Sequence, residues 1–153
     1  MFEKIQKTKR KLATYHVGLL QTKAYRVLNS RATESLKPFG ISSIEWAFLG
    51  ALYEYSFESH IGMRATVLAK VLGVEAPFVT ELSLKLEVKQ LIVVLQDEDD
   101  KRVRRISLTE KGKKCVPEVE KTMFVESKKW LKGISISDII SYVRVIKKLS
   151  DLE

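Results

Sequence analysis

The sequence has few of the residues that cross-link, break or anchor a fold. Its 153 residues include one cysteine, three prolines and seven glycines. One cysteine excludes a disulfide within the chain, and with only His16 and His60 beside it a zinc-finger type of site is excluded as well. No run reaches about 18 apolar residues, so no membrane-spanning helix is expected. The basic N-terminus is followed by no signal-peptide core, and we therefore expect a cytoplasmic protein.

Composition and charge indicate a globular protein with a polyanionic partner. Hydrophobic residues make up 45% and charged residues 30%, and the length suits one domain over 1–153. The net charge is +8, and residues 1–40 carry nine basic against two acidic residues. Such a charge suggests a polyanionic partner or merely serves solubility, and charge alone does not decide between them.

Apolar periodicity and capping residues predict helices on both sides of a short hairpin. The first expected helix covers about 5–36, and the second begins at Ser42 and ends before a loop at 55–62. The third and fourth cover 64–72 and 76–89. A fifth helix begins at Glu110, and the last follows Ser135. Ser42 and Glu45 have the spacing of a capping box, as do Ser135 and Asp138. Between the fourth and fifth helices the period changes to that of strands, at 91–96 and 101–108, joined by a polar turn at 97–100.

Two short helices joined by a tight turn and followed by a two-stranded hairpin form a winged helix-turn-helix. The predicted fold is therefore mainly α with a small β-hairpin wing. The apolar zones of the first and last helices are wider than one small core needs, so a second subunit is expected to cover them.

Three stretches resemble the MarR family of bacterial and archaeal regulators. Residues 67–93 are similar to the family's helix-turn-helix, and residues 40–52 to the helix before it. Residues 100–114, DKRVRRISLTEKGKK, are similar to its wing, where an acidic residue and an arginine precede a strand, Leu-Thr and a glycine. The resemblance covers about the whole chain.

The resemblance implies a homodimer, with 1–38 and 115–153 as dimerisation helices and 41–112 as a winged helix-turn-helix lobe. It implies sequence-specific binding to double-stranded DNA at a pseudo-palindromic operator, usually as a repressor. It also implies release by a small aromatic or anionic effector or by oxidation of a cysteine. No cofactor is implied.

The wing carries the first candidate DNA contacts. By position Arg102 matches the arginine that this family inserts into the minor groove, whose negative potential attracts arginine. Asp100 is placed to hold the Arg102 guanidinium by a bidentate pair, and the alternative is a solvated hairpin charge. Candidates for phosphate contacts are Lys101, Arg104, Arg105 and Arg64.

The helix at 76–89 is the expected reading helix. Its inward stripe is Val79, Leu82 and Leu86, and its outward face carries Pro77, Phe78, Thr80, Glu81, Leu84 and Lys85. The family commonly has an arginine at Glu81 and a polar residue at Leu84. Because Glu75, Glu81 and Glu87 outnumber Lys85 and Lys89, a rival function is open: a winged-helix dimer that acts through protein contacts at Phe78 and Leu84.

Three further residues, His16, Trp46 and Cys115, have both a functional and a structural interpretation, and a fourth, Gln90, concerns the backbone. His16 and Trp46 are candidates for an effector pocket, and the alternatives are a surface histidine and a core tryptophan. Cys115 is a redox candidate if Lys113, Lys114 and the helix start lower its pKa, but a packed thiol is the favoured interpretation. Gln90 stands where the family usually has glycine, and we expect modest local strain or a slightly different turn there.

No pattern of a catalytic site is present. The sequence has no glycine-rich phosphate loop, nucleophile elbow or HExxH helix. The DEDD cluster at 97–100 lacks the glycine and distal glutamate of a calcium loop, so a solvated turn is expected there. The chain is not expected to be an enzyme.

Overall fold

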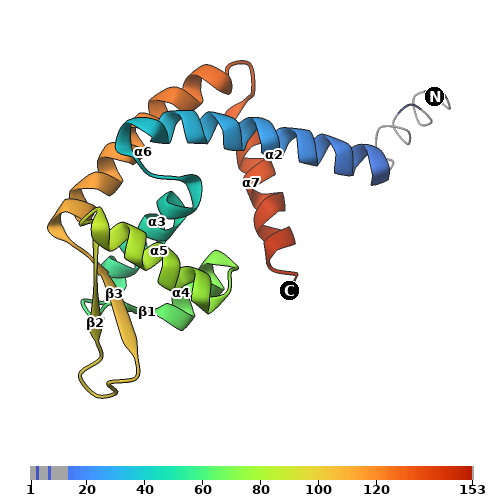
Figure 1. Cartoon of the computed structure of the whole chain (residues 1–153). Coiled ribbons are helices and arrows are strands. Elements are labelled where there is room, and N and C mark those ends of the chain that lie inside the picture. The colour runs from blue at the N-terminus through green and yellow to red at the C-terminus, as the bar shows by residue number, and fades with distance from the viewer. Residues whose placement is uncertain (1–2, 4–6, 8–13, 153) are drawn as a thin grey trace.

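A computed structural model describes residues 3, 7 and 14–152 of the chain (Figure 1). Helices dominate it, and the expected segment 5–13 of the first helix lies outside the described residues apart from residue 7. The elements in chain order are α2 (Thr14–Leu36), the 3-10 turn η1 (Lys37–Phe39), α3 (Ser43–Glu58), β1 (Met63–Arg64), α4 (Ala65–Leu72), α5 (Ala76–Val88), β2 (Ile92–Gln96), β3 (Arg104–Leu108), α6 (Glu110–Trp130) and α7 (Ile136–Ser150).

Side-chain caps begin the helices where the sequence predicts them. At α3 the Glu45 N–H donates to Ser42 Oγ (3.3 Å), and the Ser42 N–H donates to the Glu45 carboxylate (2.7 Å), which confirms the capping box. Thr109 Oγ1 accepts from the Gly112 N–H at the start of α6. At α7 the Asp138 N–H donates to Ser135 Oγ. These bonds satisfy N–H groups that a helix start otherwise leaves open.

The core lies where α3, α4 and α5 meet the sheet and the first half of α6. The inward stripe predicted for α5, Val79, Leu82 and Leu86, is buried. Phe48 and Leu49 of α3 are fully buried against it. This core orients α5 by burying one of its faces and leaving the other to solvent.

The wing belongs to a three-stranded antiparallel sheet in the order β1-β3-β2. Ile92 pairs with Leu108 and Gln96 with Arg104 in the predicted hairpin. The third strand, β1, was not predicted because it has two residues, Met63 and Arg64, which pair with Ile106 and Arg105. It joins the helix-turn-helix directly to the central strand of the wing.

Two predicted boundaries were wrong. Helix α3 continues through 55–58, where a loop was expected, because Tyr55 is half-buried against the core and the helix is closed only by Ser59. The hairpin loop covers 97–103 rather than 97–100. Within it the Asp97 N–H donates to the Val103 carbonyl, and the Val103 N–H donates to the Asp100 carbonyl.

Helices α2 and α7 leave most of their apolar side chains exposed. No residue of α7 is buried, although Ile136, Ile140, Val143, Ile146 and Leu149 are large and apolar. Figure 1 shows α7 standing apart from α3 and the sheet. No helix among the described residues combines the length and apolar character needed to cross a bilayer.

Candidate nucleic-acid interface

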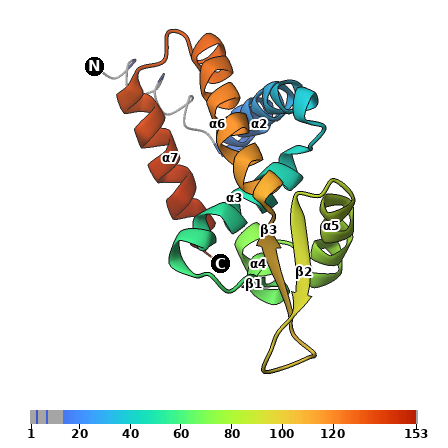
Figure 2. The same ribbon diagram turned by 90° about the vertical axis from the view of Figure 1, so that its left-hand side faces the viewer.

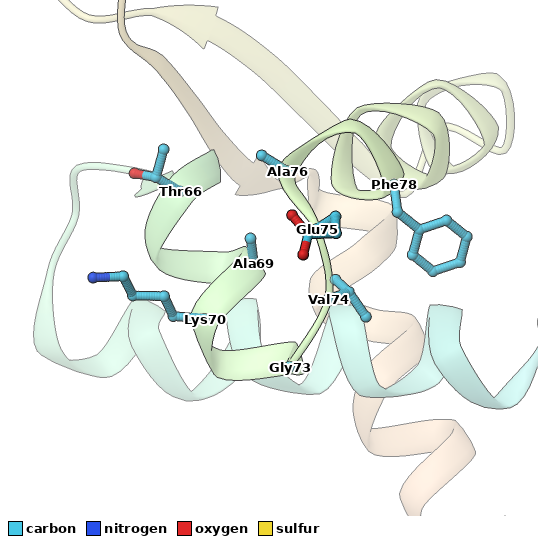
Figure 3. Close-up of a pocket in the computed structure, with 8 residues that line it drawn as sticks. All are labelled: Thr66, Ala69, Lys70, Gly73, Val74, Glu75, Ala76 and Phe78. Atoms are coloured by element: carbon cyan, nitrogen blue, oxygen red, sulfur yellow. The ribbon is translucent and has the colours of Figure 1, made fainter. Parts of the chain in front are cut away.

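The helix-turn-helix is formed by α4, a turn at Gly73 and α5. Gly73 has a positive φ of 63°, which glycine adopts without steric cost, and its N–H donates to the Lys70 carbonyl. Pro77 lies in the first turn of α5, where its missing N–H is harmless. Figure 3 shows a shallow hollow at this turn, with Lys70 and Phe78 at its sides and Glu75 between them.

The outward face of α5 has the predicted members, because Pro77, Phe78, Thr80, Glu81, Leu84 and Lys85 are all exposed. Lys85 and Glu81 form an ion pair of 2.6 Å along the helix, and this carboxylate raises the pKa of Lys85. A second acid, Glu87, accepts a hydrogen bond from the Val94 N–H of the sheet. Glu81 and Glu87, two of the three acidic residues of this helix and its start, therefore have partners within the protein.

Arg102 lies in the wing loop with its side chain 96% exposed. The bidentate pair expected with Asp100 is absent, because the nearest contact, from Arg102 Nε to Asp100 Oδ1, measures 3.9 Å. Asp100 Oδ1 instead accepts the backbone N–H of Arg102 at 3.0 Å. Lys101 and Arg104 are also exposed. The wing thus offers three cationic side chains to solvent within four residues.

Arg105, expected at a phosphate, has its contacts inside the protein. Its guanidinium forms an ion pair with Asp97 through Nε and donates to the Gly62 carbonyl at 3.1 Å. Asp97 is buried, so the expectation of a fully solvated DEDD turn is wrong at this residue. The Arg105 guanidinium, helped by the N–H groups of Asp100 and Asp99, lowers the pKa of Asp97. Sequence alone gave no sign of this pair, since an arginine and an aspartate near a hairpin are usually both solvated.

Arg64 lies on the same sheet, opposite Arg105 in the register. It is the N-cap residue of α4 with an extended backbone, and its side chain makes no capping bond and is exposed. The charge of Arg64 is therefore exposed to solvent beside the helix-turn-helix.

Comparison with known proteins identifies this arrangement. The model of the MarR family matches residues 55–103, from the end of α3 to the wing loop. Over these residues the chain is similar to the MarR family. A MarR-family transcriptional regulator from Rhodococcus sp. RHA1 superposes with a TM-score of 0.79 at 18% identity, over 92% of this chain and 96% of that chain.

Two other solved structures similar to this chain contain bound molecules. The S. aureus MepR–DNA complex has a TM-score of 0.74 at 26% identity, over 88% of this chain and 97% of that one. CouR from Rhodococcus jostii RHA1, bound to p-coumaroyl-CoA, has a TM-score of 0.76 at 16% identity, over 89% and 92%. The predicted winged-helix fold is confirmed by these likenesses.

The two effector-pocket candidates, His16 and Trp46, lie in different places. His16 is in the first turn of α2, with its ring edge-on to Tyr15. Trp46 lines a depression between α3 and α6 together with Tyr53, Pro117 and Phe124. Only Trp46 therefore borders a hollow that is lined by aromatic residues.

Cys115 is half-buried against the core of the MarR-family fold. Burial, reinforced by Glu118, raises the pKa of its thiol despite the opposing effect of Lys111. The lowering that a redox role would need is not observed. Among residues 14–152, no group of three or more acidic, histidine or cysteine side chains is placed to hold a metal ion.

Proposed function

We propose that this chain is a sequence-specific, DNA-binding transcriptional regulator that acts as a homodimeric repressor on a pseudo-palindromic operator. One observation carries the proposal: the solvent face of α5 and the exposed arginine of the wing belong to one lobe. In both views the wing hairpin projects away from α2 (Figures 1 and 2). A helix and a hairpin so arranged match the major and minor grooves of one half-site.

Each exposed group receives a role from its chemistry. Thr80 suits a thymine methyl or a phosphate, Lys85 a guanine or a phosphate, and Glu81 a cytosine amino group. Arg102 is assigned to the minor groove. Lys101, Arg104 and Arg64 are assigned to phosphates, which give affinity without reading sequence. Arg105 is not assigned to a phosphate, because its guanidinium is bound to Asp97 and to the Gly62 carbonyl.

The dimer is supported by the uncovered helices at the two ends of the chain. Eight large apolar side chains of the two helices are more than a third exposed: Ile136, Ile140, Val143, Ile146 and Leu149 of α7, and Leu19, Leu20 and Val27 of α2. Burying one such side chain fully stabilises an assembly by about 1.5–3 kcal/mol. A second copy would cover these faces, and a two-fold axis would set two α5 helices about 34 Å apart, one turn of B-DNA.

An effector is proposed for the depression beside Trp46. Tyr53 and Phe124 offer aromatic surface there, and Lys121 lies beside the carboxylates of Glu54 and Glu120, so the lining suits a small aromatic molecule. The relative bound to p-coumaroyl-CoA supports a ligand-responsive regulator. His16 lies in another element and is left out of this site.

A second candidate function rests on the reading helix itself. Phe78 and Leu84 are exposed apolar side chains on α5, and Lys85 is paired with Glu81. A helix with that surface suits a protein partner, and the chain would then sequester another regulator rather than read DNA.

Selection of bound sequences from random duplex DNA separates the two functions. The DNA-binding function predicts one enriched palindrome whose half-site centres lie about 10–10.5 base pairs apart. A pool that stays random after repeated rounds would contradict it and favour the protein-partner function.

A further inference from the structure

We infer that Arg105 is a positioning residue for the wing: by clamping Asp97 it fixes the loop 97–103 in the shape that presents Arg102 to DNA. The inference rests on the proposed DNA-binding function. It gives Arg105 a role in operator affinity without any contact to the operator.

The clamp begins with a carboxylate that is almost entirely removed from solvent. The Asp97 side chain is 6% exposed and that of Arg105 is 20% exposed. One carboxylate oxygen of Asp97 receives Arg105 Nε, and a second guanidinium nitrogen donates to the Gly62 carbonyl. The fork of Arg105 thus ties the wing loop to the segment before β1.

The other carboxylate oxygen of Asp97 organises the loop. Asp97 Oδ1 accepts the backbone N–H groups of Asp99 (3.0 Å) and Asp100 (3.1 Å). Asp100 in turn accepts the N–H of Arg102 through its side chain (3.0 Å) and that of Val103 through its carbonyl (2.8 Å). A continuous series of hydrogen bonds therefore runs from Arg105 through Asp97 and Asp100 to the backbone of Arg102.

The geometry requires arginine at this position. A lysine keeps the charge but has one nitrogen, and cannot reproduce two N–H groups held in a rigid fork. Arg105→Lys therefore leaves the net charge of the wing unchanged while loosening the clamp. A loosened loop must be ordered again when DNA binds, and that ordering reduces affinity.

Arg31→Lys is the matched control for affinity, and Arg104→Lys is the matched control for the loop itself. Arg31 lies on α2 and Arg104 is the neighbour of Arg105 on β3; both are exposed and undergo the same charge-conserving change outside the clamp. Affinity is measured for the selected duplex with wild type, Arg105→Lys, Arg31→Lys, Arg102→Ala and the double variant Arg102→Ala/Arg105→Lys. Thermal unfolding establishes that each variant is folded.

We expect Arg105→Lys to weaken binding by about tenfold, the size of one charge-assisted hydrogen bond, and Arg31→Lys to change it less than about twofold. In the Arg102→Ala background, Arg105→Lys should have no further effect, because its role passes through Arg102. A merely structural role would add its full effect in both backgrounds, and that result would overturn the inference.

Amide exchange in the free protein tests the same clamp without DNA. The N–H groups of Asp99 and Asp100 should exchange faster in Arg105→Lys and at the wild-type rate in Arg104→Lys. Unchanged exchange in Arg105→Lys would refute the clamp. If wild type itself shows no preference for any duplex, the proposed function fails and the inference with it; if wild type is selective but the two substitutions are additive, only the inference fails.

Discussion

Exposure and charge make Arg102 the residue on which wing recognition depends. Its side chain is held only by a loose contact to Asp100, so little in the protein must be broken for it to enter a groove. Arg102→Ala should weaken operator binding by about 1–3 kcal/mol without changing the oligomeric state. Titration of a labelled operator duplex measures this, and an unchanged dissociation constant would remove the wing from the interface.

Gln90 stores backbone strain at the end of α5. Its φ is +60°, and it is the one residue other than glycine with a positive φ within the described part of the chain. A left-handed conformation costs a side-chain-bearing residue about 1–2 kcal/mol, whereas glycine loses about 0.5–1 kcal/mol of chain entropy on folding.

Gln90→Gly should therefore raise the free energy of unfolding by up to about 1 kcal/mol. Urea denaturation at fixed protein concentration measures it. Gln21→Gly provides the matched control, because Gln21 lies within α2 and the same change should there destabilise by about 0.5–1 kcal/mol. Destabilisation at both positions would show that Gln90 is not strained.

At the scale of elements, the two serines at the start of α3 differ sharply. Ser42 Oγ caps the helix, whereas Ser43 Oγ is buried without a hydrogen-bond partner among the described residues. Ser42→Ala should cost about 1 kcal/mol of stability, as the loss of a cap does. Ser43→Ala should be neutral or stabilising, because it removes an unsatisfied polar group. Calorimetry compares them, and equal losses would contradict this assignment.

Elements with local signals were predictable, and elements set by distant partners were not. The caps at Ser42 and Thr109 and the inward stripe of α5 depend on residues three or four apart, and the structure confirms them. Strand β1 exists only because β3 lies beside it. The extension of α3 to Glu58 depends on core packing of Tyr55 that the local sequence does not show.

The candidate site shows the same division. The helical period predicted the exposed face of α5. The predicted hairpin likewise placed Arg102 at an exposed position. The burial of Asp97 did not, because it depends on Arg105 across the loop and on the Gly62 carbonyl 43 residues earlier in the chain.

At the scale of the whole molecule, the proposed homodimer requires that a second copy packs against α7. Val143 lies on the apolar stripe of this helix and is 58% exposed, and Ser141 lies on its polar side. Val143→Glu would bury a charge in the proposed interface, so it should produce monomer or aggregate. Ser141→Glu adds the same charge and should leave the dimer intact. Sedimentation velocity distinguishes these results, and a stable dimer of Val143→Glu would disprove the α7 interface.

The proposed function requires that this chain reads a DNA sequence. It is tested most directly by its affinity for the selected duplex and for a scrambled duplex at two salt concentrations. Sequence-specific recognition predicts that the selected duplex binds about a thousandfold tighter, or more, than the scrambled duplex. The logarithm of the binding constant should fall with the logarithm of the salt concentration, with a slope of about 0.9 for each phosphate neutralised. Equal affinities for the two duplexes, both lost steeply with salt, would contradict it.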